Sequence, residues 1–284
     1  MQTDPSKARI LRRLPFEKYL EIEDVHFSKL KAIDTSPRHY AHRVQHERRD
    51  TAALVLGRVV HAMILDPEPP GVAVYEGKVR RGAEWTAFQE AHKGETILKR
   101  DELEGAAAMR AAVLAHPIAG DLFAEGDGEV TVTFSMLGLP CKARLDWLRP
   151  NGSWCELKTT RAIEPRAFAR ECARFLYHAQ IAFYAGGLAA ATGEEAPELP
   201  HLVTVEKDPP HDVAVYRVGY DSLEAGQRKI DDWIKRLDAA RRSRSWPGVA
   251  PDILDLRLPE WTLTEGLADV DLSGIEGDGD HGSE

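Results

Sequence analysis

A predicted β-hairpin between residues 141 and 160 constrains the fold of this chain more than any other stretch. Residues 141–148 and 154–160 have the composition of strands, and the segment between them is Arg149-Pro150-Asn151-Gly152-Ser153. A proline and an Asn-Gly pair both favour tight turns. We therefore expect two strands that are joined by this turn and lie side by side.

Alternation along these strands brings charged groups together. Successive side chains of a strand point to opposite faces, so one face of the first strand should carry Cys141, Ala143, Leu145 and Trp147, and the other Lys142, Arg144 and Asp146. Glu156 and Lys158, two residues apart on the second strand, point the same way. If the strands pair, Asp146, Glu156 and Lys158 converge on one small volume.

Two carboxylates beside a lysine suit a hard cation and a phosphate group. Mg²⁺ takes oxygen ligands in octahedral geometry and usually retains several waters, so Asp146, Glu156 and the backbone carbonyl of Leu157 are candidate ligands. Lys158 is a candidate to orient or help deprotonate an attacking water and to offset the charge that develops on the phosphate. Glu129, which begins the preceding strand, is a further candidate carboxylate ligand.

Two predicted helices supply further candidates. The helix expected over 51–65 is apolar nearly all round and should be buried. It carries His61, a candidate nitrogen ligand that would make Mn²⁺ acceptable as well. Gly57 lies on the same face and costs the helix about 1 kcal/mol relative to alanine, so it indicates a close approach. Gln180 and Tyr184, four residues apart on a second helix, are candidates to hold a phosphate or the nucleic-acid backbone.

Each of these residues also has an ordinary structural interpretation. A carboxylate beside a lysine on a strand is usually a solvated cross-strand pair, and a histidine in a buried helix is more often a hydrogen-bonded core residue. Their order along the chain favours a functional site. A helical histidine precedes a strand aspartate, a Glu-x-Lys strand follows, and a Gln-x-x-x-Tyr helix comes after both.

Composition narrows the class of protein. With 284 residues, 43% hydrophobic and 29% charged, the chain can form one large soluble domain or two small ones. Three scattered cysteines without a CxxC pair indicate a reducing compartment and argue against a zinc ribbon. A net charge of −9 argues against a nonspecific basic coat but permits a local basic groove. Neither a secretory signal nor a run of about 18 apolar residues is present, so we expect no membrane association and a cytoplasmic location.

The chain divides into three predicted parts. Residues 1–20 are basic and expected to be flexible, 21–261 should form a single domain, and 262–284 should be a disordered acidic tail. Seven acidic residues and no lysine or arginine lie between 261 and 284. Solubility is the default role for such a tail, and partner binding or shielding of a DNA channel are alternatives. Within the domain, 129–158 should form a three-stranded antiparallel meander, and 201–206 should pair with 213–218.

At these motifs the sequence resembles the PD-(D/E)XK nuclease superfamily, and within it the RecE-like (exonuclease VIII type) exonucleases of phages and prophages. The resemblance spans roughly 22–261 and rests on the segments 36–40, 51–68, 142–146, 156–160, 180–184 and 205–210. Glu156 departs from the aspartate that many members carry, although the superfamily motif admits either residue.

The resemblance implies an α/β (α+β) fold with a central mixed β-sheet flanked by helices. It implies metal-dependent hydrolysis of phosphodiester bonds in linear double-stranded DNA, with 5′-to-3′ digestion that leaves a 3′ single strand for recombination. A RecT-like annealing partner and a ring-shaped homo-oligomer are implied as well. Basic residues in the matching motifs, Arg58, Lys142 and Arg144, are candidates for DNA contacts. The alternatives are another nuclease of the superfamily, including an endonuclease or a single-strand or RNA nuclease, and a non-catalytic DNA-binding module that retains the fold.

Overall fold

A mixed sheet, built from strands of both halves of the chain, organises the protein. The computed structural model describes residues 8–46, 50–66, 71–194 and 199–264. Its seven-stranded sheet has the order β1-β5-β6-β7-β8-β9, and β2 also pairs with β6. The strands are β1 (Arg9–Leu11), β2 (Val25–His26), β5 (Asp127–Met136), β6 (Leu139–Leu148), β7 (Trp154–Thr160), β8 (His201–Glu206) and β9 (Val213–Arg217).

The chain also forms helices, several of which cover the two faces of this sheet. The helices are α1 (Phe16–Glu21), α2 (Phe27–Leu30), α3 (Pro37–Gln45), α4 (Ala52–Leu65), α5 (Gly82–Ala91), α6 (Arg100–Ala115), α7 (Pro117–Ala124), α8 (Pro165–Phe175), α9 (Tyr177–Thr192) and α10 (Tyr220–Ser243), with a 3₁₀ turn at Lys31–Asp34. Two short strands, β3 (Val72–Val74) and β4 (Thr96–Leu98), form a separate parallel pair between α4 and α6. The mixed sheet flanked by helices confirms the expected fold class.

The predicted meander is present. β5 and β6 are antiparallel over most of their length, and β6 and β7 are antiparallel next to the 149–153 turn. The pairing of β8 with β9 is also confirmed, and β8 joins the meander by running parallel to β7. A parallel neighbour requires a long crossover, which here consists of α8 and α9.

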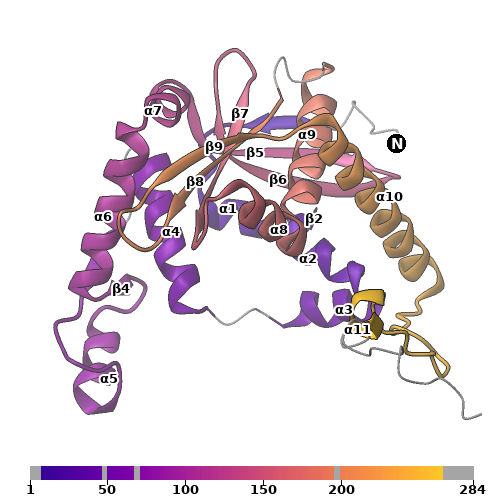
Figure 1. The fold of residues 1–284 in the computed structure, drawn as a ribbon, viewed down its shortest axis with the longest axis horizontal. Coiled ribbons are helices and arrows are strands. Elements are labelled where there is room, and N and C mark those ends of the chain that lie inside the picture. Colours follow the sequence, from indigo (N-terminus) through magenta and orange to yellow (C-terminus); the bar gives the residue numbers. More distant parts are fainter. Residues whose placement is uncertain (1–7, 47–49, 67–70, 195–198, 265–284) are drawn as a thin grey trace, which may run out of the picture. The chain divides into compact units, whose positions relative to one another are not determined.

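Two apolar clusters hold the helices to the sheet. The first contains Val132, Phe134 and Leu145 from the strands together with Phe183 of α9 and Trp233 of α10. The second contains Leu157 and Val203 from the strands with Val60 of α4 and Met109 of α6. Figure 1 shows α4 and α6 to the left of the central strands and α9 and α10 to the right. The sheet is therefore covered on both faces.

Several expectations about individual segments are wrong. Arg9–Leu11, expected to be flexible, forms edge strand β1 and pairs with Thr131–Thr133 of β5, because an exposed sheet edge offers unpaired backbone groups. Helix α4, expected to be buried, has exposed residues in its first turn, and its fully buried positions are Val59, Val60 and Leu65. The second half of this helix supplies the buried side chains, and Val55 and Leu56 of the first half are partly buried against the same cluster.

The alternation expected along β6 fails at its end. Trp147 packs against Phe123, with ring centroids 5.8 Å apart, in the cluster opposite to that of Leu145. The β5–β6 ladder pairs Gly128 with Trp147 and Val130 with Leu145, and Glu129 between them has a φ of 55°. This left-handed backbone at Glu129 interrupts the ladder where the side-chain pattern changes face.

The chain falls into two compact units, residues 1–248 and 249–284. The sheet and the helices up to α10 belong to the first, so its end precedes the boundary expected at 261. In the second unit the structure describes a segment without helix or strand and α11 (Glu260–Thr264). The expected acidic tail lies almost entirely outside the described residues.

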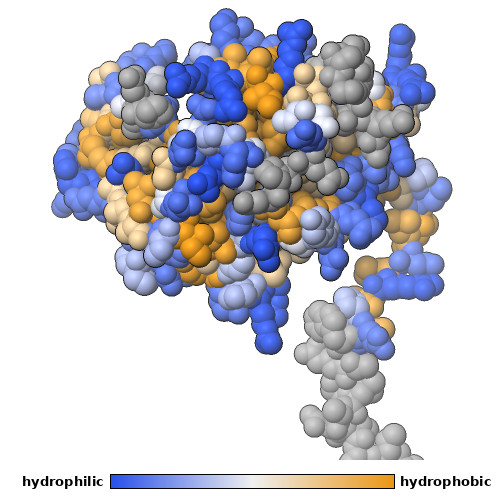
Figure 2. Space-filling view, turned by 90° about the horizontal axis from the view of Figure 1, so that it is seen from above, coloured by the Kyte–Doolittle hydropathy of each residue, from blue (hydrophilic) through white to orange (hydrophobic). Residues whose placement is uncertain are grey.

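Among the described helices, none combines the length and the apolar character needed to cross a membrane. On the face shown in Figure 2, apolar side chains lie in several separate patches between polar ones.

Two glycines within helices differ in the space around them, so their replacement by alanine should have opposite effects on stability. A Cβ at Gly226 of α10 would lie 2.3 Å from the carbonyl oxygen of His178 in α9, whereas a Cβ at Gly105 of α6 would meet no atom within 4 Å. We expect Gly226→Ala to lower the free energy of unfolding by about 1–3 kcal/mol through overpacking. Gly105→Ala should raise it by about 0.5–1 kcal/mol, because alanine favours the helix. Urea unfolding of both variants measures the difference, and equal effects would contradict the close contact of α9 and α10.

Candidate active site

Strands β6 and β7 separate soon after their turn, and two carboxylates replace the backbone ladder there. The last paired residues before the separation are Trp147 and Cys155. One residue further, the N–H of Asp146 donates to Oε1 of Glu156 at 3.2 Å, and the N–H of Leu157 donates to Oδ2 of Asp146 at 2.7 Å. Each carboxylate thus fixes the opposite strand, and both face the space that opens between the strands.

Glu156 also connects the sheet to helix α9. Its Oε2 lies 2.9 Å from Nζ of Lys158 and accepts a hydrogen bond of 3.1 Å from Nε2 of Gln180. The same amide donates to the hydroxyl of Tyr184 at 3.2 Å. Asp146, Glu156, Lys158, Gln180 and Tyr184 therefore form one connected polar group, which is the convergence that the sequence pattern predicts.

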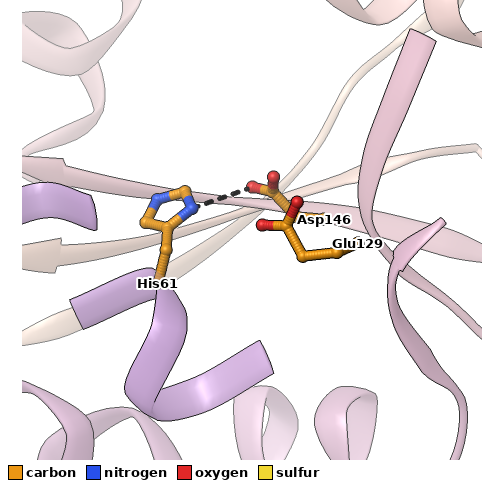
Figure 3. Close-up of side chains that lie close together, drawn as sticks. All are labelled: His61, Glu129 and Asp146. Carbon is orange, nitrogen blue, oxygen red and sulfur yellow. Dashed lines mark ion pairs between the residues drawn. The ribbon is translucent and has the colours of Figure 1, made fainter. Parts of the chain in front are cut away.

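A second group of potential ligands lies beside Asp146. One side-chain ligand atom from each of His61, Glu129 and Asp146 lies within 4.8 Å of the others. Nδ1 of His61 is 3.7 Å from Oδ2 of Asp146, and Figure 3 shows the imidazole directed from α4 towards the two carboxylates on the strands. The backbone of Leu157 lies close enough to the His61 ring to counteract part of the fall in its pKa. Nitrogen and oxygen donors thus surround one position, and Glu156, engaged by Lys158 and Gln180, lies beside it.

Helix α4 comes close enough to the sheet for His61 to reach these carboxylates. A Cβ at Gly57 would lie 3.4 Å from Oγ1 of Thr159 on β7, and a Cβ at Gly128 of β5 would lie 2.0 Å from the carbonyl oxygen of Leu65. The close approach that Gly57 predicts is therefore present. A second glycine, Gly128, serves the other end of the helix, and no sequence pattern singled it out.

Burial and mutual repulsion shift the ionisation of these groups. Burial raises the pKa of Asp146 and that of Glu156, and the positive charge of Lys158 opposes both shifts. Burial alone would lower the pKa of Lys158, but the charges of Glu156 and Asp146 raise it overall. Burial lowers the pKa of His61 to about 4, and the charge of Lys158 acts in the same direction. A neutral imidazole is the form that binds metal ions.

Glu129 owes its position to an unusual backbone and to Arg144. Its φ of 55° lies in the left-handed region, which residues with a side chain seldom occupy and which is over-represented at functional sites. The guanidinium of Arg144 forms an ion pair with the Glu129 carboxylate and donates to the carbonyl of Leu14 at 3.1 Å. Arg144, expected to contact DNA, is instead held inside the protein and positions Glu129.

The other two basic residues expected to contact DNA, Lys142 and Arg58, differ in exposure. Lys142 is 3% exposed and donates to the carbonyl oxygens of Tyr19 and Ile22 at 2.5 and 2.6 Å. Its expected contact with DNA is wrong, because the buried ammonium already donates to the backbone carbonyls at the C-terminal end of α1. The side chain of Arg58 is 57% exposed and forms an ion pair with Asp50 at 2.6 Å. Its contact with DNA stays a prediction.

Tyr177 is an aromatic residue of this region that the sequence motifs do not include. The ring centroid of Tyr177 is 5.4 Å from Nζ of Lys158, a cation–π distance. Tyr177 precedes Gln180 by three residues, so both lie on the same side of α9. That spacing before the Gln-x-x-x-Tyr motif is the signal that could have identified it.

The ion pair of Lys158 makes a prediction for the metal-free protein. Lys158→Met leaves the buried carboxylates of Glu156 and Asp146 without their cation, which should lower the free energy of unfolding by about 3–5 kcal/mol. Lys158→Met combined with Glu156→Gln should cost less than the sum of the two single changes, because one buried charge then disappears with its partner. Urea unfolding in EDTA tests this, and simple additivity would show that the pair is not coupled.

Comparisons with known proteins agree with this architecture. A crystal structure from Eubacterium rectale, named "Putative exonuclease", has a TM-score of 0.62, with 17% identity over 89% of this chain and 99% of its own. At that identity the likeness shows the fold alone. The solved structure of SSO0001 has a TM-score of 0.28, with 14% identity over 80% of this chain and 89% of its own, which is too low to support an argument. No curated protein sequence matches. Residues 26–255 match the family described as "PDDEXK-like domain of unknown function (DUF3799)". This match spans most of the chain and includes every site residue described above. The chain therefore belongs to that family.

Proposed function

We propose that this protein is a metal-dependent deoxyribonuclease that hydrolyses phosphodiester bonds of linear double-stranded DNA. One observation carries the proposal: His61, Glu129 and Asp146 gather around one position, and the Glu156–Lys158 pair lies beside it. Membership of a PDDEXK-like family and the fold it shares with a protein named as an exonuclease support a nuclease of this class.

The donor set fits a divalent cation. Side-chain ligands would be His61, Glu129 and Asp146, with the backbone of Leu157 close to the imidazole. Oxygen donors suit Mg²⁺, and a histidine nitrogen makes Mn²⁺ acceptable too. Burial raises the pKa values of Asp146 and Glu156, and repulsion from a neighbouring carboxylate adds to each shift; a cation at this position would offset both effects. When bound, the ion would polarise the phosphate and make a water more acidic.

The residues of the chain have separate tasks in this proposal. Lys158, held by Glu156 at 2.9 Å, brings positive charge to the place where a phosphate gains negative charge during attack. Gln180 donates to the same Glu156 oxygen, Oε2, at 3.1 Å and so helps to fix the carboxylate that holds Lys158. Tyr184, whose pKa burial raises well above the ordinary value, stays protonated and completes the support of Gln180.

We extend the proposal to the direction of digestion. The resemblance to RecE-like exonucleases favours attack from the 5′ end of a duplex, leaving a 3′ single strand that a RecT-like protein could anneal. An endonuclease with the same core and a DNA-binding module without activity are the competing interpretations, and the second experiment below separates all three.

Metal binding can be tested apart from activity. Addition of Mn²⁺ or Mg²⁺ should raise the melting temperature, because an ion that binds the folded state at a concentration of about 100 Kd contributes about 2.7 kcal/mol. Asp146→Asn, which removes a ligand charge but keeps the side-chain shape, should abolish the shift. Asp101→Asn, on the surface of α6, is the control and should leave it intact. An equal shift in the Asp146 variant would refute the ligand assignment.

The reaction itself is tested with duplexes labelled at either the 5′ or the 3′ end. We expect Mg²⁺-dependent degradation of linear duplexes, with early release of the 5′ label as mononucleotides and a 3′ label retained on shortening strands. Asp146→Ala and Lys158→Ala should each reduce the rate by at least about 10²-fold. Cleavage of closed circles would identify an endonuclease. Binding of DNA without cleavage under any metal condition would favour the non-catalytic module.

A further inference from the structure

Helix α8 carries an exposed row of arginines next to the site. Arg166, Arg170 and Arg174 follow one another at intervals of four residues, and Arg161 is exposed in the turn before the helix. None of the four takes part in an ion pair or a side-chain hydrogen bond within the described chain. The Arg174 guanidinium lies 5.3 Å from the ring centroid of Phe175, its next neighbour. We call Arg166, Arg170 and Arg174 the arginine row.

The absence of partners distinguishes this row from the arginines of α10. On that helix Arg228, Arg236 and Arg242 each form an ion pair with a carboxylate four residues earlier in the chain. Such pairs are the usual arrangement on an exposed helix. The charge of the α10 arginines is therefore compensated locally, whereas that of the arginine row is left for another molecule.

The acidic residues of α8 are committed to other contacts. Glu171 accepts a hydrogen bond of 2.9 Å from the Thr160 hydroxyl. Glu164 caps the helix, since its two carboxylate oxygens accept from the N–H groups of Arg166 and Ala167 at 3.1 and 2.9 Å. These backbone hydrogen bonds lower the pKa of Glu164, and the charge of Arg170 contributes less. The exposed face beyond the first turn consequently has a positive charge.

The structure fixes this face beside the catalytic group. Helix α8 links β7, which carries Glu156 and Lys158, to α9, which carries Gln180, and Figure 1 shows it at the front of the sheet. The Thr160–Glu171 hydrogen bond ties its middle to the end of β7. The Phe168 ring stacks on Tyr216 of β9 with centroids 4.8 Å apart. The arginine row is thus carried by a helix that is fixed to β7 and β9.

We propose that the arginine row binds the phosphate backbone of the nucleic acid whose scissile bond lies at the site. This inference rests on the proposed nuclease function and names the surface that holds its substrate. Guanidinium groups bind phosphate oxygens in a bidentate manner. Residues four apart on a helix rise by about 6 Å, so successive arginines can reach separate phosphates of a strand. Contacts of this kind are independent of base sequence.

A phospholipid surface would also attract a basic helix, but α8 does not suit it. Interfacial helices insert an apolar face into the membrane. The apolar side of α8 is used within the protein, where Phe168 is 2% exposed. Phe175, 41% exposed, is the one large apolar side chain of this helix at the described surface, and Arg174 lies over it. Charge without a free apolar face favours the phosphate backbone.

The test compares two triple variants with the same change of charge. One replaces the arginine row (Arg166→Gln, Arg170→Gln, Arg174→Gln), and the control replaces the ion-paired arginines of α10 (Arg228→Gln, Arg236→Gln, Arg242→Gln). Binding of a short fluorescent duplex is measured in EDTA, so that no turnover occurs, over a range of salt concentrations. We expect the arginine-row variant to bind the duplex at least about tenfold more weakly at about 50 mM salt. The plot of the logarithm of the association constant against the logarithm of salt concentration should become shallower, its negative slope losing about 3 in magnitude. The control should bind like the unmodified chain.

A small substrate separates this inference from the proposed function. Hydrolysis of bis(p-nitrophenyl) phosphate in Mn²⁺ needs the site but no long backbone, so the arginine-row variant should retain it while degrading duplexes more slowly. If the unmodified chain does not hydrolyse this substrate, the proposed nuclease function is contradicted. The duplex-binding measurement would still test the arginine row, because it does not depend on hydrolysis. Equal duplex binding by both triple variants would overturn the inference. So would loss of binding to anionic phospholipid vesicles without loss of duplex binding.

Discussion

The exchange of hydrogen bonds between Asp146 and Glu156 is the interaction on which the rest of the site depends. Where β6 and β7 part, the carboxylate of each strand accepts from a backbone N–H of the other, at 3.2 and 2.7 Å. Unpaired backbone groups at a sheet's interior are costly, and these bonds satisfy two of them. The same bonds place two buried negative charges together. The stability of the strand junction and the proposed cation site therefore depend on the same two carboxylates.

Neighbouring elements surround these two carboxylates and complete the site. Lys158 and Gln180 contact Glu156 directly. Arg144 neutralises Glu129, and a glycine on β5 lets the end of α4 approach until His61 lies 3.7 Å from Asp146. These contacts come from strands and helices on both faces of the sheet. The site is consequently a property of the whole layered fold, although its central residues lie on one hairpin.

Burial determines which basic side chains of this protein are exposed for contact with another molecule. Lys142 and Arg144 belong to the motif that resembles nuclease sequences, yet both are engaged by the protein's own backbone or by Glu129. The arginines of α8 belong to no recognised motif and have an exposed face without ionic partners among the described residues. Proximity to a motif in sequence was a poor guide to which charges are free. A four-residue arginine spacing on an amphipathic helix was the better signal.

The amino-acid sequence by itself determined the meander, the major helices and the convergence of Asp146, Glu156 and Lys158, because turn residues and the two-residue period of strands act locally. It did not determine the edge strand β1, the change of face at Trp147 or the role of Arg144. Those depend on the positive φ of Glu129 and on contacts between residues far apart in the chain, such as Arg144 with Leu14. Only the tertiary structure decides contacts of this kind, because they arise when separate elements are packed against each other.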